Sequence, residues 1–152
     1  IFKTVDAVYS KSAKVHRATN VRQAMDILEG GTVGVMLSDL RVGNEDVSVF
    51  LKVLRESYPL VVTIVLTSVK DGEAVVGLIN EGQIFRLLPK PPKNALVKLS
   101  IDSAMHRYTA CKSEPSLLDR YQGQEIKDKK MISPQILDRL KSLRSRFMAA
   151  TH

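Results

Sequence analysis

Short apolar runs rich in valine, isoleucine and leucine alternate along this chain with segments whose apolar residues recur at helical spacing. This alternation predicts an α/β fold with a parallel sheet, because parallel strands are usually buried on both faces. The expected strands are residues 14–18, 32–37, 60–66 and 84–88. The expected helices are residues 21–29, 45–57, 72–81 and 94–108, the last with Asn94 as its N-cap.

Two further helices are expected outside this pattern. Residues 1–10 carry apolar side chains at helical rather than alternating spacing. Near the other end, Ser133 and Pro134 favour a helix start, as N-cap and first turn. The apolar stripe of that helix consists of Ile136, Leu140, Leu143 and Phe147. The expected organisation is a domain at residues 1–110, a polar and charged linker at 111–132, and an amphipathic C-terminal helix at 133–152.

The C-terminal helix has basic residues outside its apolar stripe, and this pattern leaves two interpretations open. The helix could pack with a solvated charged face, or it could serve as a dimerisation element or as the docking element for an output partner. DNA binding is the least favoured alternative, because a helix-turn-helix needs a second helix and a tight turn.

Composition narrows the class of protein. The net charge of the 152 residues is +7, but it is spread along the chain, so nucleic acid is not favoured as a partner. No apolar run approaches the ~18 residues of a membrane span, and no signal peptide is recognisable, so we expect a cytoplasmic protein. Cys111 is the only cysteine, which excludes an internal disulfide and argues against a thiolate metal cluster.

Three chemically active side chains follow three of the expected strands. Asp39, Thr67 and Lys90 each come directly after an apolar run. In open α/β sheets functional groups gather at the carboxyl edge of the strands, so an acid, a hydroxyl and an ammonium should meet there. This set suits transfer of a phosphoryl group to the Asp39 carboxylate. Lys90 would neutralise the transferred oxygens, and the Thr67 hydroxyl would donate a hydrogen bond to one of them.

These motifs resemble the receiver domain of bacterial two-component response regulators. The resemblance is carried by Ser38-Asp39-Leu40-Arg41, Val65-Leu66-Thr67-Ser68, Ile79-Asn80-Glu81-Gly82 and Lys90-Pro91. The intervals also fit, because Thr67 lies 28 positions after Asp39 and Lys90 lies 23 after Thr67. The resemblance implies a doubly wound, flavodoxin-like sheet with strand order 2-1-3-4-5. It also implies phosphorylation of Asp39 by a histidine kinase or phosphotransfer protein, with no enzymatic activity beyond self-phosphorylation and self-dephosphorylation.

The resemblance implies further details of the site. Mg²⁺ would be bound by Asp39 and the backbone carbonyl of Arg41. The peptide bond between Lys90 and Pro91 would be cis. Phosphorylation would reorient Thr67 and alter the surface formed by the fourth helix, fifth strand and fifth helix.

The sequence also departs from the family pattern. Gly43, Val47 and Leu87 stand where receivers usually have proline, glycine and a switching aromatic residue. The first strand, which ends in acidic metal ligands, is expected to be missing, so the chain would start within the first helix. Asp6 is the only early acid, and it lies too close to the next expected strand.

Three interpretations therefore remain open. The chain could be part of an ordinary receiver, or a Mg²⁺-independent pseudo-receiver that acts as a docking or dimerisation module. It could also be the regulatory domain of a larger cyclic-di-GMP signalling enzyme.

Overall fold

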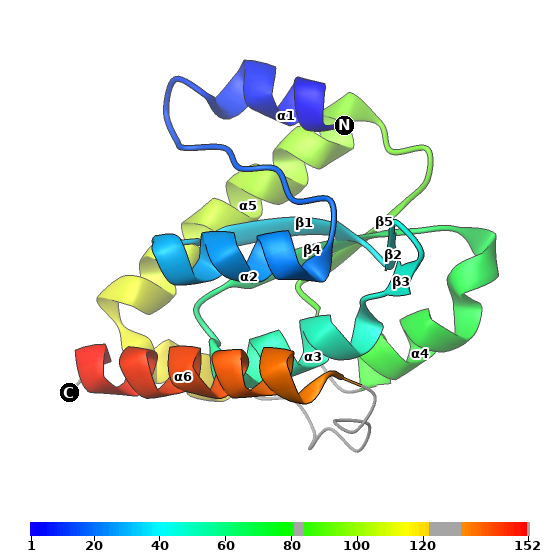
Figure 1. Cartoon of the computed structure of the whole chain (residues 1–152). Helices are drawn as coiled ribbons and strands as arrows, with labels where there is room; N and C mark the ends of the chain where they lie inside the picture. Colours follow the sequence, from blue (N-terminus) through cyan, green and yellow to red (C-terminus); the bar gives the residue numbers. More distant parts are fainter. Residues whose placement is uncertain (81–83, 122–131, 152) are drawn as a thin grey trace.

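The computed structural model describes residues 1–80, 84–121 and 132–151 (Figure 1). Its helices are α1 (Phe2–Tyr9), α2 (Val21–Gly30), α3 (Ser48–Ser57), α4 (Gly72–Asn80), α5 (Asn94–Ser113) and α6 (Pro134–Thr151), with 3-10 helices η1 (Val69–Asp71) and η2 (Pro115–Tyr121). Its strands are β1 (Val35–Asp39), β2 (Arg41–Val42), β3 (Glu45–Asp46), β4 (Val62–Thr67) and β5 (Arg86–Pro89).

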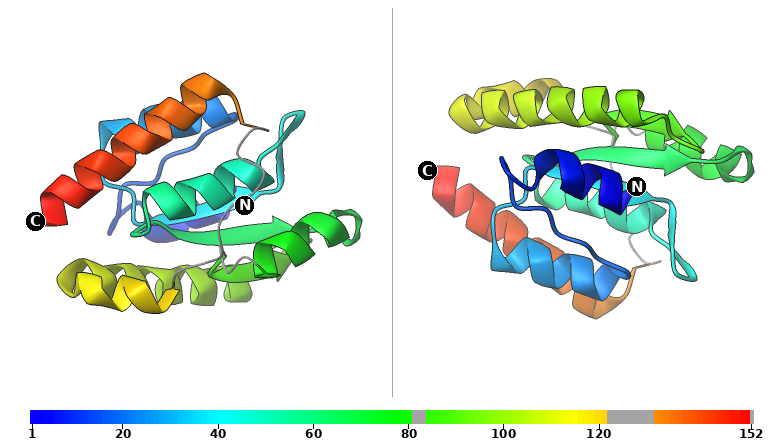
Figure 2. Two further views of the ribbon diagram at one scale, coloured as in Figure 1. Left: turned by 90° about the horizontal axis from the view of Figure 1, so that it is seen from below. Right: turned by 90° about the horizontal axis from the view of Figure 1, so that it is seen from above.

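The main sheet has three parallel strands in the order β1-β4-β5. Helix α5 covers one face, and α2, α3 and α6 lie on the other (Figure 2). Helix α1 packs with the part of the core that lies under α5. The predicted doubly wound, receiver-like α/β fold is confirmed. The strand order matches the last three strands of the order that the resemblance implies.

The central strand β4 divides the core in two, because successive side chains of a strand point to opposite faces. Val62, Ile64 and Leu66 pack with α1 and α5. Val65 packs on the other face with α2, α3 and α6. Burial on both faces explains why β4 reads as one continuous apolar run in the sequence.

The strand expected at residues 14–18 does not form, and this prediction was wrong. These residues have no regular secondary structure. Within the described residues, β1 pairs only with β4, so its other edge has no neighbouring strand. In the implied order, the second strand pairs only with the first. Without that partner, residues 14–18 have nothing in the sheet to which they can hydrogen-bond.

The helix expected from residue 45 starts later, at Ser48. Residues 45–46 form β3, which pairs with β2 in a short antiparallel hairpin. Gly43 lies in its turn with φ of +62°, a conformation that glycine adopts at little cost. The backbone N–H of Ser48 then donates to Asp46 Oδ1 at 2.9 Å, and the helix follows.

The expected cap at Asn94 was also wrong. Lys93 is the N-cap residue of α5, and its side chain makes no capping hydrogen bond. Helix α5 continues beyond Tyr108 to Ser113, and η2 follows it, so part of the expected linker is helical. The remainder of that segment, residues 122–131, lies outside the described residues.

The C-terminal helix folds back onto its own chain. Ser133 caps it as predicted, with its Oγ accepting from the Ile136 N–H at 3.3 Å. Leu140 is completely buried against α2 and α3. Arg139 binds both carboxylate oxygens of Glu29 at 2.6 and 2.8 Å and reaches Asp26 at 2.7 Å. Part of the predicted stripe is therefore buried within the molecule; the side chains of Leu143 and Phe147 lie outside the described set.

Across the described part of the chain, no helix combines the length and apolar character that crossing a membrane would require. Cys111 is a buried free thiol on α5.

Candidate functional site

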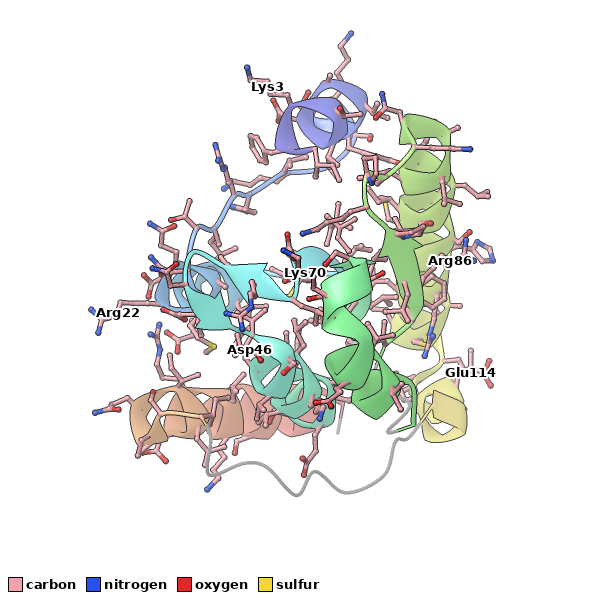
Figure 3. The ribbon with its side chains drawn as sticks, turned by 90° about the vertical axis from the view of Figure 1, so that its right-hand side faces the viewer. Lys3, Arg22, Asp46, Lys70, Arg86 and Glu114 are labelled. Carbon is pink, nitrogen blue, oxygen red and sulfur yellow. The ribbon has the colours of Figure 1, made fainter. Side chains whose placement is uncertain are left out.

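The three predicted side chains belong to one edge of the sheet. Asp39 ends β1, Thr67 ends β4, and Lys90 directly follows β5. Asp39 pairs in register with Leu66, the residue before Thr67, so the ends of β1 and β4 are level. Thr67 in turn pairs with Pro89, the residue before Lys90. The hairpin and α4 lie on the side that faces the viewer in Figure 3.

An ion pair joins the first and last of these residues. Lys90 Nζ donates to Asp39 Oδ2, and the two side chains are 36% and 33% exposed. An ion pair of this exposure contributes only about 0–1 kcal/mol, because water screens it. Lys90 can therefore shift its charge to another anion at low cost, and the Asp39 carboxylate is accessible to a reactant.

Backbone bonds hold Lys90 and Thr67 together. The Lys90 N–H donates to the Thr67 carbonyl at 2.7 Å. The Thr67 hydroxyl donates to the Leu88 carbonyl at 3.4 Å, a long and therefore weak hydrogen bond. The Thr67 hydroxyl can thus turn to a better acceptor at small energetic cost. The Lys90-Pro91 peptide bond is cis, the isomer that the resemblance implied.

Comparisons with solved structures identify the fold. One match is a signal receiver domain of an HD domain-containing protein from Pseudomonas fluorescens Pf-5, with a TM-score of 0.66 and 24% identity over 74% of this chain and 83% of that one. Another is titled adenylate cyclase from Rhodopirellula baltica, with a TM-score of 0.67 and 24% identity over 77% of this chain and 87% of that one.

The chain has the receiver-domain fold.

Sequence comparison gives a match over a shorter segment. The hydrogenase transcriptional regulatory protein HoxA of Bradyrhizobium diazoefficiens is 32% identical over 72 residues. That segment is 47% of this chain and only 15% of HoxA, so the chain matches a small part of that relative. No family model matches the chain.

Arg41 and Leu87 are two further residues to which the resemblance assigned a role. The Arg41 N–H lies 3.4 Å from Asp39 Oδ1, at the start of the β2–β3 hairpin, and its side chain is exposed. Leu87, at the expected switching position, is half-buried on β5 and packs against the core on the α3 side.

The described residues do not form the Mg²⁺ site that the resemblance implies. Mg²⁺ prefers octahedral coordination by carboxylate, carbonyl and water oxygens. Asp39 offers one carboxylate, which Lys90 already neutralises in part. No group of three His, Cys, Asp or Glu side chains in the described portion of the chain could hold a metal ion. Lys90 and Thr67 are therefore the described side chains that could bind a transferred phosphoryl group.

Sequence reasoning missed one acidic residue beside this site. Asp71 Oδ2 accepts from the Ser68 backbone N–H at 2.7 Å and from the Ser68 hydroxyl at 3.0 Å. Ser68 is thus the N-cap residue of η1. The signal was present, because Ser-x-x-Asp has the spacing of a capping box.

Proposed function

We propose that this chain is a response-regulator receiver that accepts a phosphoryl group on Asp39 and changes a protein-interaction surface in response. The observation that carries the proposal is the Asp39–Lys90 ion pair at the carboxyl edge of a receiver-like sheet. The pair supplies an accessible nucleophilic carboxylate and a mobile cation in one place. Thr67 supplies a hydroxyl donor from the neighbouring strand.

The transfer would proceed by attack of an Asp39 carboxylate oxygen on phosphorus. An O–P bond forms, and the bond between phosphorus and the donor breaks, with its electron pair leaving on the donor. If the donor is a phosphohistidine of a histidine kinase or phosphotransfer protein, that electron pair stays on the imidazole nitrogen. Lys90 would move from the carboxylate to the transferred oxygens, where negative charge accumulates.

The same step suggests how a signal leaves the site. The Thr67 hydroxyl would exchange its weak bond to the Leu88 carbonyl for a phosphoryl oxygen. Leu88 belongs to β5, and the chain after Thr67 leads into η1 and α4. The movement would therefore reach α4, β5 and α5, the surface that we propose binds an output partner.

The domain organisation remains part of this proposal. Residues 1–110 would be the receiver, residues 111–132 its connection, and residues 133–152 the helix toward an output partner or a second copy. Packing of α6 on α2 and α3 supports a receiver that is in contact with this helix. A cytoplasmic location fits a protein phosphorylated by a kinase inside the cell.

A second candidate is the regulatory domain of a larger signalling protein. Two proteins with this fold are named as an adenylate cyclase and as the receiver domain of an HD domain-containing protein. The relative named HoxA is also much longer than the segment matched. The sequence motif Ile79-Asn80-Glu81-Gly82 favours a cyclic-di-GMP signalling enzyme as that larger protein.

A third candidate is a Mg²⁺-independent docking module. It is favoured because no group of three His, Cys, Asp or Glu side chains among the described residues could hold a metal ion. The discriminating experiment is incubation of the natural full-length protein with acetyl phosphate, with and without Mg²⁺, followed by intact-mass measurement.

The receiver proposal predicts the mass of one added phosphoryl group in the natural protein, and none in Asp39→Asn. Lys90→Ala should reduce the rate of incorporation, because it removes the cation beside the carboxylate. The absence of any added mass in the natural protein would contradict phosphorylation and leave the docking module as the better candidate.

A further inference from the structure

The chain that follows Thr67 is held by a single carboxylate oxygen. Asp71 Oδ2 accepts both the backbone N–H and the hydroxyl of Ser68, at 2.7 and 3.0 Å. The Asp71 N–H donates back to the Ser68 carbonyl at 3.0 Å. Three hydrogen bonds thus close the turn between the end of β4 and the start of α4.

Thr67 itself is held at its backbone and only loosely at its hydroxyl. Its carbonyl accepts from the Lys90 N–H at 2.7 Å, whereas its hydroxyl has the 3.4 Å contact with Leu88. The direction in which the hydroxyl points therefore depends on the backbone of Thr67. Lys90 holds the carbonyl of Thr67, and Ser68 is the next residue along the chain. Asp71 fixes Ser68.

Asp71 also shares the electrostatic surroundings of the site. The Ser68 backbone N–H is the main reason that the pKa of the Asp71 carboxyl is lowered. The positive charges of Lys90 and Arg41 lower that pKa further. Asp71 is therefore ionised at neutral pH, and Lys90, which pairs with Asp39, also contributes to the electrostatic surroundings of Asp71.

We propose that Asp71 is a positioning residue for phosphoryl transfer at Asp39: by holding Ser68, it keeps the Thr67 hydroxyl where that hydroxyl can donate to the transferred group. The inference rests on the proposed function and deepens it. Asp71 does not touch the reacting atoms in this account; it acts through Ser68 and Thr67. A misplacement of about 1 Å at a reacting centre can lower a rate ~100-fold, so a turn that holds a donor is significant for catalysis.

The test compares three substitutions with a matched control in the full-length protein, using acetyl phosphate as the donor. Asp71→Ala removes the acceptor, and Asp71→Asn removes the charge but keeps an acceptor oxygen. Ser68→Ala removes only the hydroxyl bond and keeps the backbone N–H. Glu73→Ala is the control, because Glu73 is an exposed acid in the first turn of α4.

The expected results follow from positioning. Asp71→Ala should lower the initial rate of phosphorylation about 10- to 100-fold, a loss of the size expected when a reacting group is misplaced. Asp71→Asn should keep the rate within about threefold of that of the natural protein, because the amide oxygen still accepts from Ser68 and the Thr67 hydroxyl is not misplaced. Ser68→Ala should fall between the two, and Glu73→Ala should leave the rate unchanged.

Two results would overturn the inference. One is a rate for Asp71→Ala equal to that of Glu73→Ala. The other is a rate for Asp71→Asn as low as that for Asp71→Ala, which would assign the effect to charge and not to position. If Asp71→Ala fails to fold by circular dichroism, Ser68→Ala and Asp71→Asn still give the comparison.

Failure of the inference is distinguishable from failure of the proposed function. If the natural protein takes up no phosphoryl group, the proposed function fails and Asp71 has no reaction to support. If the natural protein is phosphorylated and Asp71→Ala matches it in rate, the function stands and only the positioning role is wrong.

Discussion

Leu140→Ala should destabilise the protein strongly, because Leu140 anchors α6 to the rest of the molecule. Its side chain is 0% exposed and belongs to the core formed with α2 and α3. The substitution removes three carbon atoms, whose burial is worth ~0.8 kcal/mol each. A residual cavity adds to this loss, so we expect a decrease of about 2–5 kcal/mol in the free energy of unfolding.

The assay is urea denaturation followed by circular dichroism, with amide hydrogen exchange of α6 measured in parallel. Leu99→Ala is the matched control, because Leu99 is 58% exposed on α5 and should change stability by less than about 0.5 kcal/mol. If α6 separates before the rest of the domain unfolds, the lost packing of α6 will be detected as faster hydrogen exchange of its amides. Unchanged stability together with unchanged exchange would refute the docking of α6 on α2 and α3.

Two further predictions concern packing and pH. Gly34→Ala should lower the free energy of unfolding by about 1–3 kcal/mol, because the new Cβ would lie 2.7–2.9 Å from three ring atoms of Tyr108. Chemical denaturation would measure this loss. Gly30→Ala is the control and should show no such loss, because the space around Gly30 is open. The lowered pKa of Asp71 stabilises the fold above the ordinary carboxyl value of about 3.9, and this contribution is lost as pH falls through the still lower folded value. Melting temperatures between pH 2 and 7 should therefore fall less steeply with acid in Asp71→Asn than in the natural protein, and parallel curves would contradict this assignment.

The sequence predicted where Asp39, Thr67 and Lys90 lie in the sheet better than it predicted the edges of the fold. Asp39, Thr67 and Lys90 were identifiable because each follows an apolar run, and parallel strands end at one edge. The strand at residues 14–18 was wrong because strand formation depends on a distant partner, which local composition does not reveal. Asp71 was missed although its spacing from Ser68 is that of a capping box.

Other features depend on tertiary structure. The apolar stripe of α6 predicted that this helix would be buried, but it did not reveal the ion pair between Arg139 and Glu29. That pair forms because the chain folds back across more than a hundred positions. Residues 45–46 were predicted as the start of a helix, but they form the second strand of a hairpin, because Gly43 supplies a turn that helical periodicity does not detect. Hydrophobic spacing encodes neither of these contacts.

The central claim is that Asp39 carries the phosphoryl group, and the most direct test is chemical trapping of the acyl phosphate. The full-length protein would be treated with acetyl phosphate and Mg²⁺, reduced with borohydride, digested and sequenced by mass spectrometry. Borohydride converts an aspartyl phosphate to homoserine, so the account predicts homoserine at position 39 and nowhere else. Homoserine at another aspartate, or none in a protein that gains phosphoryl mass, would contradict it.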